Sequence, residues 1–268
     1  MLGKLIKYDF RSCWRKFWPF WLAILVMSLL CGIGYRLEAR LHDNVMRLLS
    51  GGLPFILLFF ICSATLLVAI VYICRQFFTG LLGDPGYLMF TIPARTWQLI
   101  SSKAIVALLL ELLSLAAGML GAGLFILIGK WEEMKVFFGD IAEAVRDHSL
   151  PQIPGDVIGF FLLLFLLALV FFLSVNLHVY ASISIGHLAR KNRVLLSVAS
   201  YVGIGFLMTV IGILLGEMGI WANVVHALQV GALEANAAVG TLILGLIIEC
   251  GIYFLVSHEI LQHHLNLE

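Results

Sequence analysis

Charged residues are scarce in this chain of 268 residues. They make up 12% of it, whereas hydrophobic residues make up 62% and the mean hydropathy is +1.03. An average soluble domain carries about 25% charged residues. A soluble fold of this length has no interior large enough to hide so much apolar surface, so lipid must act as the solvent for much of the chain. The composition therefore excludes a soluble enzyme and indicates an integral membrane protein.

Motifs that would bring chemistry are missing as well. The net charge of +1 gives no basic field for nucleic acid. The phosphate-binding GxxxxGK[ST] loop is absent, because Gly129-Lys130 is followed by Trp131. The HExxH zinc motif fails at Gln262, four residues after His258, and the five scattered cysteines form no CxxC pair. We therefore predict no catalytic residue, cofactor or metal site, and any ATP hydrolysis would need a separate subunit.

Six apolar segments are long enough to cross a bilayer, whose hydrocarbon core takes about 20 helical residues. Backbone groups in lipid must be satisfied within their own segment, so each is predicted to be a helix. The predicted spans are Phe17–Gly34, Leu53–Cys74, Ala104–Gly129, Val157–Ile185, Val194–Leu215 and Ala237–Ser257. The predicted fold class is an all-α integral membrane protein with six transmembrane helices, forming a single transmembrane domain over residues 1–268.

The distribution of lysine and arginine predicts the orientation. Eleven of the 17 basic residues lie on the side that holds the N-terminus, and six lie on the other side with ten of the 16 acids. Because basic flanks stay in the cytoplasm, both termini are predicted to be cytoplasmic, in a multi-pass protein of the cell membrane.

The first residues are predicted to form an amphipathic helix over 1–16 that lies in the membrane interface. Apolar residues recur there at spacings of three and four, with basic residues on the opposite side. The apolar set is Leu2, Ile6, Phe10, Cys13 and Phe17, and the basic set is Lys4, Lys7, Arg11 and Arg15. The alternative is a simple positively charged anchor for the first span.

The cytoplasmic loop over 75–103 is unusually apolar. Its centre, Gly83-Asp84-Pro85-Gly86, has the composition of a turn. The apolar residues around it would not be left in water, so they mark either a partner-binding site or packing against the base of the bundle. Both interpretations stay open on composition alone.

Two segments on the outer side differ in character. Residues 130–156 are acidic and are predicted to form a short helix with a solvated face, followed by a loop between Pro151 and Pro154. Residues 216–236 are mildly apolar and interrupted by glycine and polar residues. This second segment is predicted to enter the outer interface without crossing it.

Two acidic residues, Glu111 and Glu249, lie within predicted spans. A charge at the bilayer midplane costs about 2.5 to 3.5 kcal/mol on insertion scales, so such residues are rare. They could line a transport path. Alternatively, each could make a structural hydrogen bond to a group such as Ser114, Asn176 or His178.

A face of small residues marks the fifth span. Its members recur at spacings of four, three and four: Gly205, Thr209, Gly212 and Gly216. In lipid, such faces allow two helix backbones to approach closely. We therefore predict a tight contact with another helix there, with the lining of a cavity as the alternative.

Three stretches of sequence resemble a known family. They are the opening MLGKLIKYDF (residues 1–10), the loop LLGDPGYLMFTIP (81–93) followed by WQLI and Lys103, and YASISIGHL (180–188) before Arg190-Lys191. With these motifs the whole chain resembles the membrane subunit of a type-2 ATP-binding-cassette (ABC) transporter of the kind common in Gram-positive bacteria. Pro85 departs from the pattern, where an acidic residue is expected.

The resemblance implies a permease that works with other subunits. The loop after the second span would hold a coupling helix that docks on the ATPase, with the contact residues Phe77, Phe78, Leu82, Asp84, Tyr87, Phe90 and Arg95. Residues 216–236 would form the short re-entrant segment before the last span. Two permeases would pair above two ATPase subunits and export an amphipathic cargo such as an antimicrobial peptide, drug or lipid. The alternatives are a non-transporting immunity or sensory-complex subunit, and a secondary carrier that couples to protons through Glu249.

Overall fold

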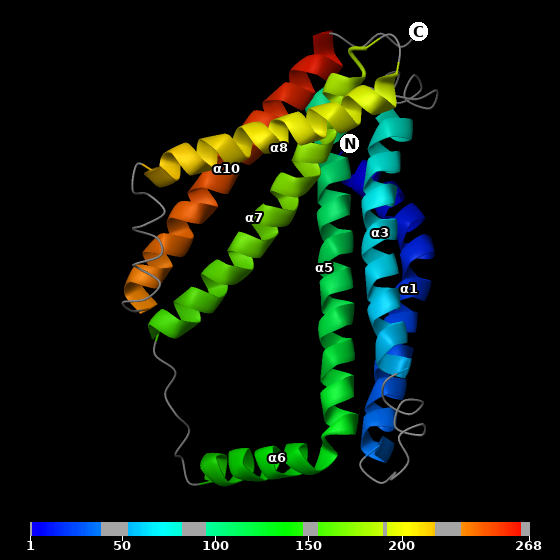
Figure 1. Ribbon diagram of the computed structural model, residues 1–268, viewed down its shortest axis with the longest axis vertical. Coiled ribbons are helices and arrows are strands. Elements are labelled where there is room, and N and C mark those ends of the chain that lie inside the picture. Colours follow the sequence, from blue (N-terminus) through cyan, green and yellow to red (C-terminus); the bar gives the residue numbers. More distant parts are fainter. Residues whose placement is uncertain are drawn as a thin grey trace. The chain divides into compact units, whose positions relative to one another are not determined.

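The computed structural model describes residues 2–38, 53–81, 95–146, 155–189, 192–217 and 232–263. Within these ranges the chain is helical and contains no strand. The helices are α1 (Leu2–Glu38), α3 (Leu53–Leu81), α5 (Thr96–Gly129), α6 (Trp131–Arg146), α7 (Gly155–Gly186), α8 (Arg193–Glu217) and α10 (Ala232–His263), as labelled in Figure 1.

Six of these helices are long and apolar enough to cross a membrane. The candidate spans are Leu2–Leu37, Ile56–Phe78, Thr96–Gly129, Val157–Gly186, Arg193–Leu214 and Asn236–His263. Each predicted span overlaps one of them, so among the described residues every predicted span corresponds to one candidate helix, in the predicted order. The remaining described helix, α6, is the short helix predicted in the acidic segment.

The helix ends differ from the predicted boundaries. α1 runs without a break through the predicted boundary between residues 16 and 17, so no separate interfacial helix precedes the first span. The amphipathic pattern itself is present, because Cys13 and Phe17 are buried while Lys7 and Arg11 are exposed. One continuous helix forms because nothing in this stretch breaks it. Pro19 is tolerated within the helix.

The predicted loop over 75–103 is also shorter than expected. α3 continues to Leu81 and α5 begins at Thr96, so both flanks of the loop are helical. The coupling helix would fall in residues 82–94, outside the described ranges. Likewise, α8 extends to Glu217 and α10 begins at Ala232, which leaves 218–231 of the predicted re-entrant segment outside the described ranges.

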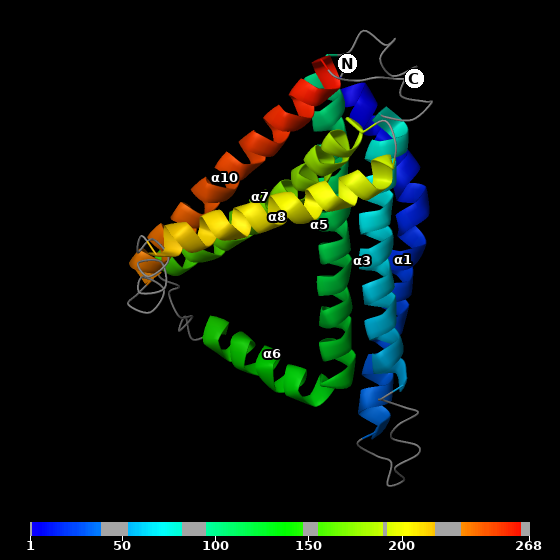
Figure 2. The ribbon, with the colours of Figure 1, turned by 45° about the horizontal axis from the view of Figure 1, so that its top comes forward.

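The chain divides into two compact units. The first contains Met1–Lys7, Tyr72–Leu108 and Ile153–Glu268, and the second contains Tyr8–Val71 and Leu109–Gln152. In the first unit, α7 packs against both α8 and α10, as Figures 1 and 2 show. Both chain ends belong to this unit: Leu5 packs against the core cluster that contains Leu261.

The core of the first unit joins four helices. Its buried apolar residues come from the end of α3, the start of α5, the second half of α7 and the second half of α10. They include Ile73 and Phe77, Leu99, Ile100, Ala104 and Ala107, Leu177, Tyr180 and Ala181, and Cys250, Tyr253 and Leu261. At its centre, the rings of Phe77 and Tyr180 stack with centroids 4.2 Å apart, and both side chains are fully buried.

In the second unit, α1 and α5 approach closely. A methyl group added at Gly121 would come within 2.6 Å of Ser28 Oγ, and one added at Gly32 would come within 3.0 Å of Ile128 Cβ. Nearby, Trp21 Nε1 donates a hydrogen bond to Ser114 Oγ at 3.0 Å. Small residues at these positions let the two helices meet at backbone distance, which is how helices associate in lipid.

Candidate functional site

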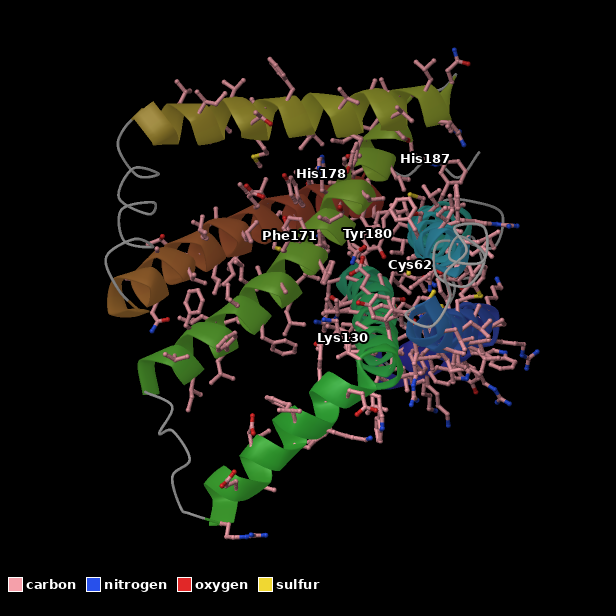
Figure 3. The ribbon with its side chains drawn as sticks, turned by 60° about the horizontal axis from the view of Figure 1, so that its bottom comes forward. Cys62, Lys130, Phe171, His178, Tyr180 and His187 are labelled. Carbon is pink, nitrogen blue, oxygen red and sulfur yellow. The ribbon has the colours of Figure 1, made fainter. Side chains whose placement is uncertain are left out.

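A cluster of polar side chains lies among the spans of the first unit. α7 contributes Ser174 and His178, one helical turn apart, and α10 contributes Glu249 and Tyr253 with the same spacing. α8 contributes Tyr201. Residues four apart lie on one face of a helix, so each pair presents two polar groups to the same neighbour. Figure 3 labels His178 and Tyr180 on α7, and His187 just beyond the end of that helix at Gly186.

The contacts in this cluster link all three helices. Ser174 Oγ donates a hydrogen bond to Glu249 Oε2 at 3.4 Å. The His178 ring stacks on Tyr201, with centroids 4.4 Å apart, and on Tyr253, with centroids 5.0 Å apart; both ring pairs are nearly parallel. A carboxylate, an imidazole and two phenol groups therefore share one site within the membrane-spanning segments.

This cluster is suited to hold a polar or cationic group inside the membrane. Glu249 is half-buried and Tyr201 is 43% exposed, so the cluster is open on the α8 side. His178 Nε2 is buried and has no hydrogen-bond partner among the described residues. Carboxylates and aromatic faces both attract cations, and they do so more strongly where water is excluded. A carboxylate at this depth is by default a candidate functional group.

The structural alternative for Glu249 was a hydrogen bond to a group such as Ser114, Asn176 or His178. In the structure the hydroxyl of Ser174 donates a hydrogen bond to Glu249. Glu111 lies on α5 in the second unit, where it is half-buried and has interactions of its own. Ser114, expected as a possible partner, bonds to Trp21 Nε1 and to the carbonyl of Leu110.

The predicted docking residues fall into three groups. Phe77 was predicted to dock on the ATPase, but its side chain is fully buried against Tyr180. Its ring therefore offers no surface to a partner. Phe78 is half-buried against the same core, and Arg95 is exposed at the start of α5. The remaining docking residues, Leu82, Asp84, Tyr87 and Phe90, lie outside the described ranges.

The start of α5 is held by a partial capping box. Arg95 stands at the N-cap position, and its backbone N–H donates to Gln98 Oε1 at 3.3 Å. The side chain of Gln98, the third residue of the helix, thus accepts a hydrogen bond from a backbone N–H that has no partner within the helix. The return of the chain from the loop into α5 is therefore fixed by Gln98, which lies in the WQLI motif that follows the loop.

The connection between α7 and α8 is tightly packed. Phe78 contacts the His187 ring, with centroids 4.8 Å apart. Burial, with a smaller contribution from the charge of Arg193, lowers the pKa of His187, so this ring is mostly neutral at pH 7. Asn192 adopts a left-handed backbone with φ of 61°, which turns the chain into α8. Asparagine tolerates this conformation better than most residues.

Gly186 is required at this connection by space rather than by its φ angle. A methyl group at Gly186 would overlap the side chain of Ser197 and lie 2.7 Å from its Cα. Because the backbone of α8 blocks it, Gly186→Ala must push α8 away from α7, at a cost of about 1 to 3 kcal/mol. We expect a lower midpoint of thermal unfolding in detergent. Gly203→Ala on α8, where a methyl group meets nothing within 4 Å, is the control. Equal stability of the two variants would contradict the predicted contact.

The residues of the predicted small-residue face on α8 do not all face the same neighbour. A methyl group at Gly205 would reach van der Waals distance of His178, at 3.8 Å, so this residue faces α7 of its own chain. Thr209 is exposed, and a methyl group at Gly212 would meet no heavy atom within 4 Å. Gly216 belongs to α8, but its surroundings are outside what the structure describes. The close helix contacts lie instead at Gly186 and along α1 and α5.

Several residues of the site and core were missed by the sequence analysis. Tyr201, Tyr253 and Ser174 sit in apolar runs, where single polar or aromatic residues do not stand out. Lys103, assigned to the end of the loop, is only 3% exposed within α5. The seam between α1 and α5 did have a signal, because Ser28 and Gly32 are four residues apart, as are Ala117 and Gly121.

Taken together, the fold and the polar cluster define a multi-pass membrane protein with six candidate spans and a carboxylate site among three of them. Among the described residues, no group of three His, Cys, Asp or Glu side chains could hold a metal ion. Comparison with models of protein families, with curated proteins and with solved structures finds no match for this chain.

Proposed function

We propose that the chain is the membrane permease subunit of an ATP-driven ABC exporter. One observation carries the proposal: both flanks of the loop over 82–94 are built into the same core as α7 and α10. Phe77 at the end of α3 and Leu99 near the start of α5 are buried in one cluster with Tyr180 and Tyr253. A subunit that moved this loop would therefore act directly on the helices that carry the polar cluster.

Tyr253 connects the core that holds the loop flanks with the polar cluster. It is buried in the core with the loop flanks, and its ring also stacks on His178, next to Glu249. An ATPase has to transmit work through a contact on the permease surface, because this chain has no nucleotide-binding motif of its own. The path from loop to core to polar cluster supplies that mechanical connection.

The partners in this proposal are two ATPase subunits and a second permease. Pairing of permeases would use α8, whose apolar side chains Val198, Val202 and Phe206 are exposed in the single chain. Both termini would face the cytoplasm, on the side of the ATPase subunits. The cargo would be amphipathic, with a polar or cationic part held at Glu249 and an apolar part in lipid.

The proposal is tested by expressing the chain with a cassette ATPase encoded beside it. We expect the ATPase subunit to remain bound through purification and to hydrolyse ATP when both are reconstituted in liposomes. An ATPase that binds without any cargo flux would favour the sensory or immunity subunit. Flux that follows a proton gradient without an ATPase would favour the secondary carrier and overturn the proposal.

Glu249→Gln separates a transport role from a structural one. Glutamine keeps an acceptor oxygen for Ser174, so we expect the fold to be unchanged. A hydrogen bond to a charged group contributes about 1.5 to 3 kcal/mol, so loss of the charge should reduce cargo transport by roughly tenfold to a hundredfold. The measurement is the initial rate of transport in liposomes, with the thermal unfolding midpoint as the check on folding.

Ser174→Ala is the matched control for this variant. It removes the donor at 3.4 Å and keeps the carboxylate. If Glu249 serves only as a structural contact, the alanine variant should lose stability while Glu249→Gln transports normally. That pair of results would remove Glu249 from the transport path.

A further inference from the structure

α6 is an amphipathic helix whose apolar side is exposed. Over Trp131–Arg146, its large apolar residues recur at spacings of three and four and gather on one side. They are Trp131, Met134, Phe137, Phe138 and Ile141. Phe137 and Phe138 are more than half exposed, at 55% and 52%. The opposite side carries four acidic side chains, Glu132, Glu133, Asp140 and Glu143.

The position of α6 along the chain restricts what can cover this apolar side. α5, a candidate span, ends at Gly129, and α6 begins at Trp131 after the single residue Lys130. Figures 1 and 2 show α6 turning sharply away from the axis of α5, and Figure 3 labels Lys130 at the junction. Because the apolar stretch of α5 ends at Gly129 and is followed by the charged Lys130, we expect α6 to begin near the boundary between hydrocarbon and headgroups.

The side chains at the junction suit that level. Lys130 Nζ pairs with Glu133 at 3.1 Å, and Lys135 Nζ lies 5.7 Å from the centroid of the Trp131 ring while pairing with Glu132. Tryptophan is enriched at the headgroup level, where its ring is partly in lipid and its N–H is in water. Lysine can keep its stem in the apolar layer and its ammonium group in water.

We propose that α6 lies in the lipid–water interface of the membrane that holds the spans, with Phe137, Phe138 and Ile141 in the acyl region and its acidic side in water. Interfacial helices have this combination of a strongly polar side and a large apolar side. The helix has four acidic and two basic side chains, so attraction to anionic lipid is not what holds it there. Continuity with α5 and the burial of apolar area are sufficient. This inference rests on the membrane-spanning character of the chain and is independent of transport.

Photo-crosslinking in the full-length protein tests this placement. A benzoylphenylalanine residue would replace either Phe138 or Asp140 in protein reconstituted in phosphatidylcholine nanodiscs that contain an alkyne-tagged phosphatidylcholine. Both positions are exposed, but they are separated by about 200° around the helix. On irradiation, the variant with the probe at position 138 should form a tagged lipid adduct. The variant with the probe at position 140 should form none. The probe needs no introduced cysteine, so the native cysteines do not have to be replaced.

The possible outcomes are distinct. No lipid adduct at either position would place α6 in water, and an adduct at both would embed it in the bilayer; either result would overturn the proposal. A protein adduct at position 138 would show that a second chain or a bound partner, and not lipid, covers the apolar side of α6. That result would also overturn the proposal. If either first variant fails to accumulate, the pair Ile141 and Glu143 repeats the comparison on the same two sides of the helix.

Discussion

Phe77→Ala should be among the most destabilising single changes in this chain. The Phe77 ring is fully buried and stacks on Tyr180 at 4.2 Å, with only 9° between the two ring planes. Removing a large buried aromatic side chain leaves a cavity and costs about 3 to 5 kcal/mol in a packed core. In a membrane bundle the loss is mainly one of packing contacts, because lipid is as apolar as the phenyl ring. We expect a clear fall in the thermal unfolding midpoint of the purified protein.

Phe59→Ala is the matched control for this prediction. Phe59 lies on the same helix, α3, but it is 66% exposed within the chain. Its truncation removes the same atoms without opening a cavity in the core, so the midpoint should change little. If the two variants were equally stable, Phe77 would not be a core residue and would return to the set of docking residues.

The sequence was sufficient to predict the spans because lipid places a simple demand on them. About 20 apolar residues must follow one another without charge, and six stretches meet that condition. The same reasoning failed at the helix ends. Outside the hydrocarbon, a helix continues until a residue stops it, and neither residues 2–16 nor residues 75–81 contain such a stop.

Partners across helices were harder to predict than the helices themselves. The spacing of Gly205, Thr209 and Gly212 showed that a small-residue face exists on α8, but not which neighbour it meets. In the structure, α8 is fitted to α7 at Ser197, opposite Gly186. A one-dimensional pattern fixes the side of a helix on which a residue lies, and only packing decides what that side contacts.

The polar cluster shows the same limit. Glu249 was recognised because a carboxylate inside a span is costly. Tyr201 and Tyr253 carry no such cost, since a phenol group is readily accommodated in apolar surroundings. Their role becomes visible only when α8 and α10 bring both rings onto His178.

Changing Leu82, Tyr87 and Phe90 together to alanine should abolish retention of the ATPase subunit by the permease. These are the three apolar docking residues predicted between the end of α3 at Leu81 and the start of α5, whereas Phe77 belongs to the core. Anchors at the centre of an interface contribute about 1 to 3 kcal/mol each when truncated, so the triple change should weaken binding by at least about a hundredfold in Kd. The measurement is co-purification of the ATPase subunit with the solubilised permease.

Phe77→Ala and Asp84→Lys make this experiment specific. Phe77→Ala should lower the unfolding midpoint of the permease, because Phe77 belongs to the buried cluster. If the triple change acts on docking alone, that variant should keep the midpoint of the unmodified chain. Asp84→Lys should weaken binding less than the triple change, since charges at the rim of an interface affect association rate more than affinity. If the triple variant kept the ATPase subunit at the level of the unmodified chain, the loop would only pack against its own bundle. The connection from loop to core to Glu249 would then have no role in coupling.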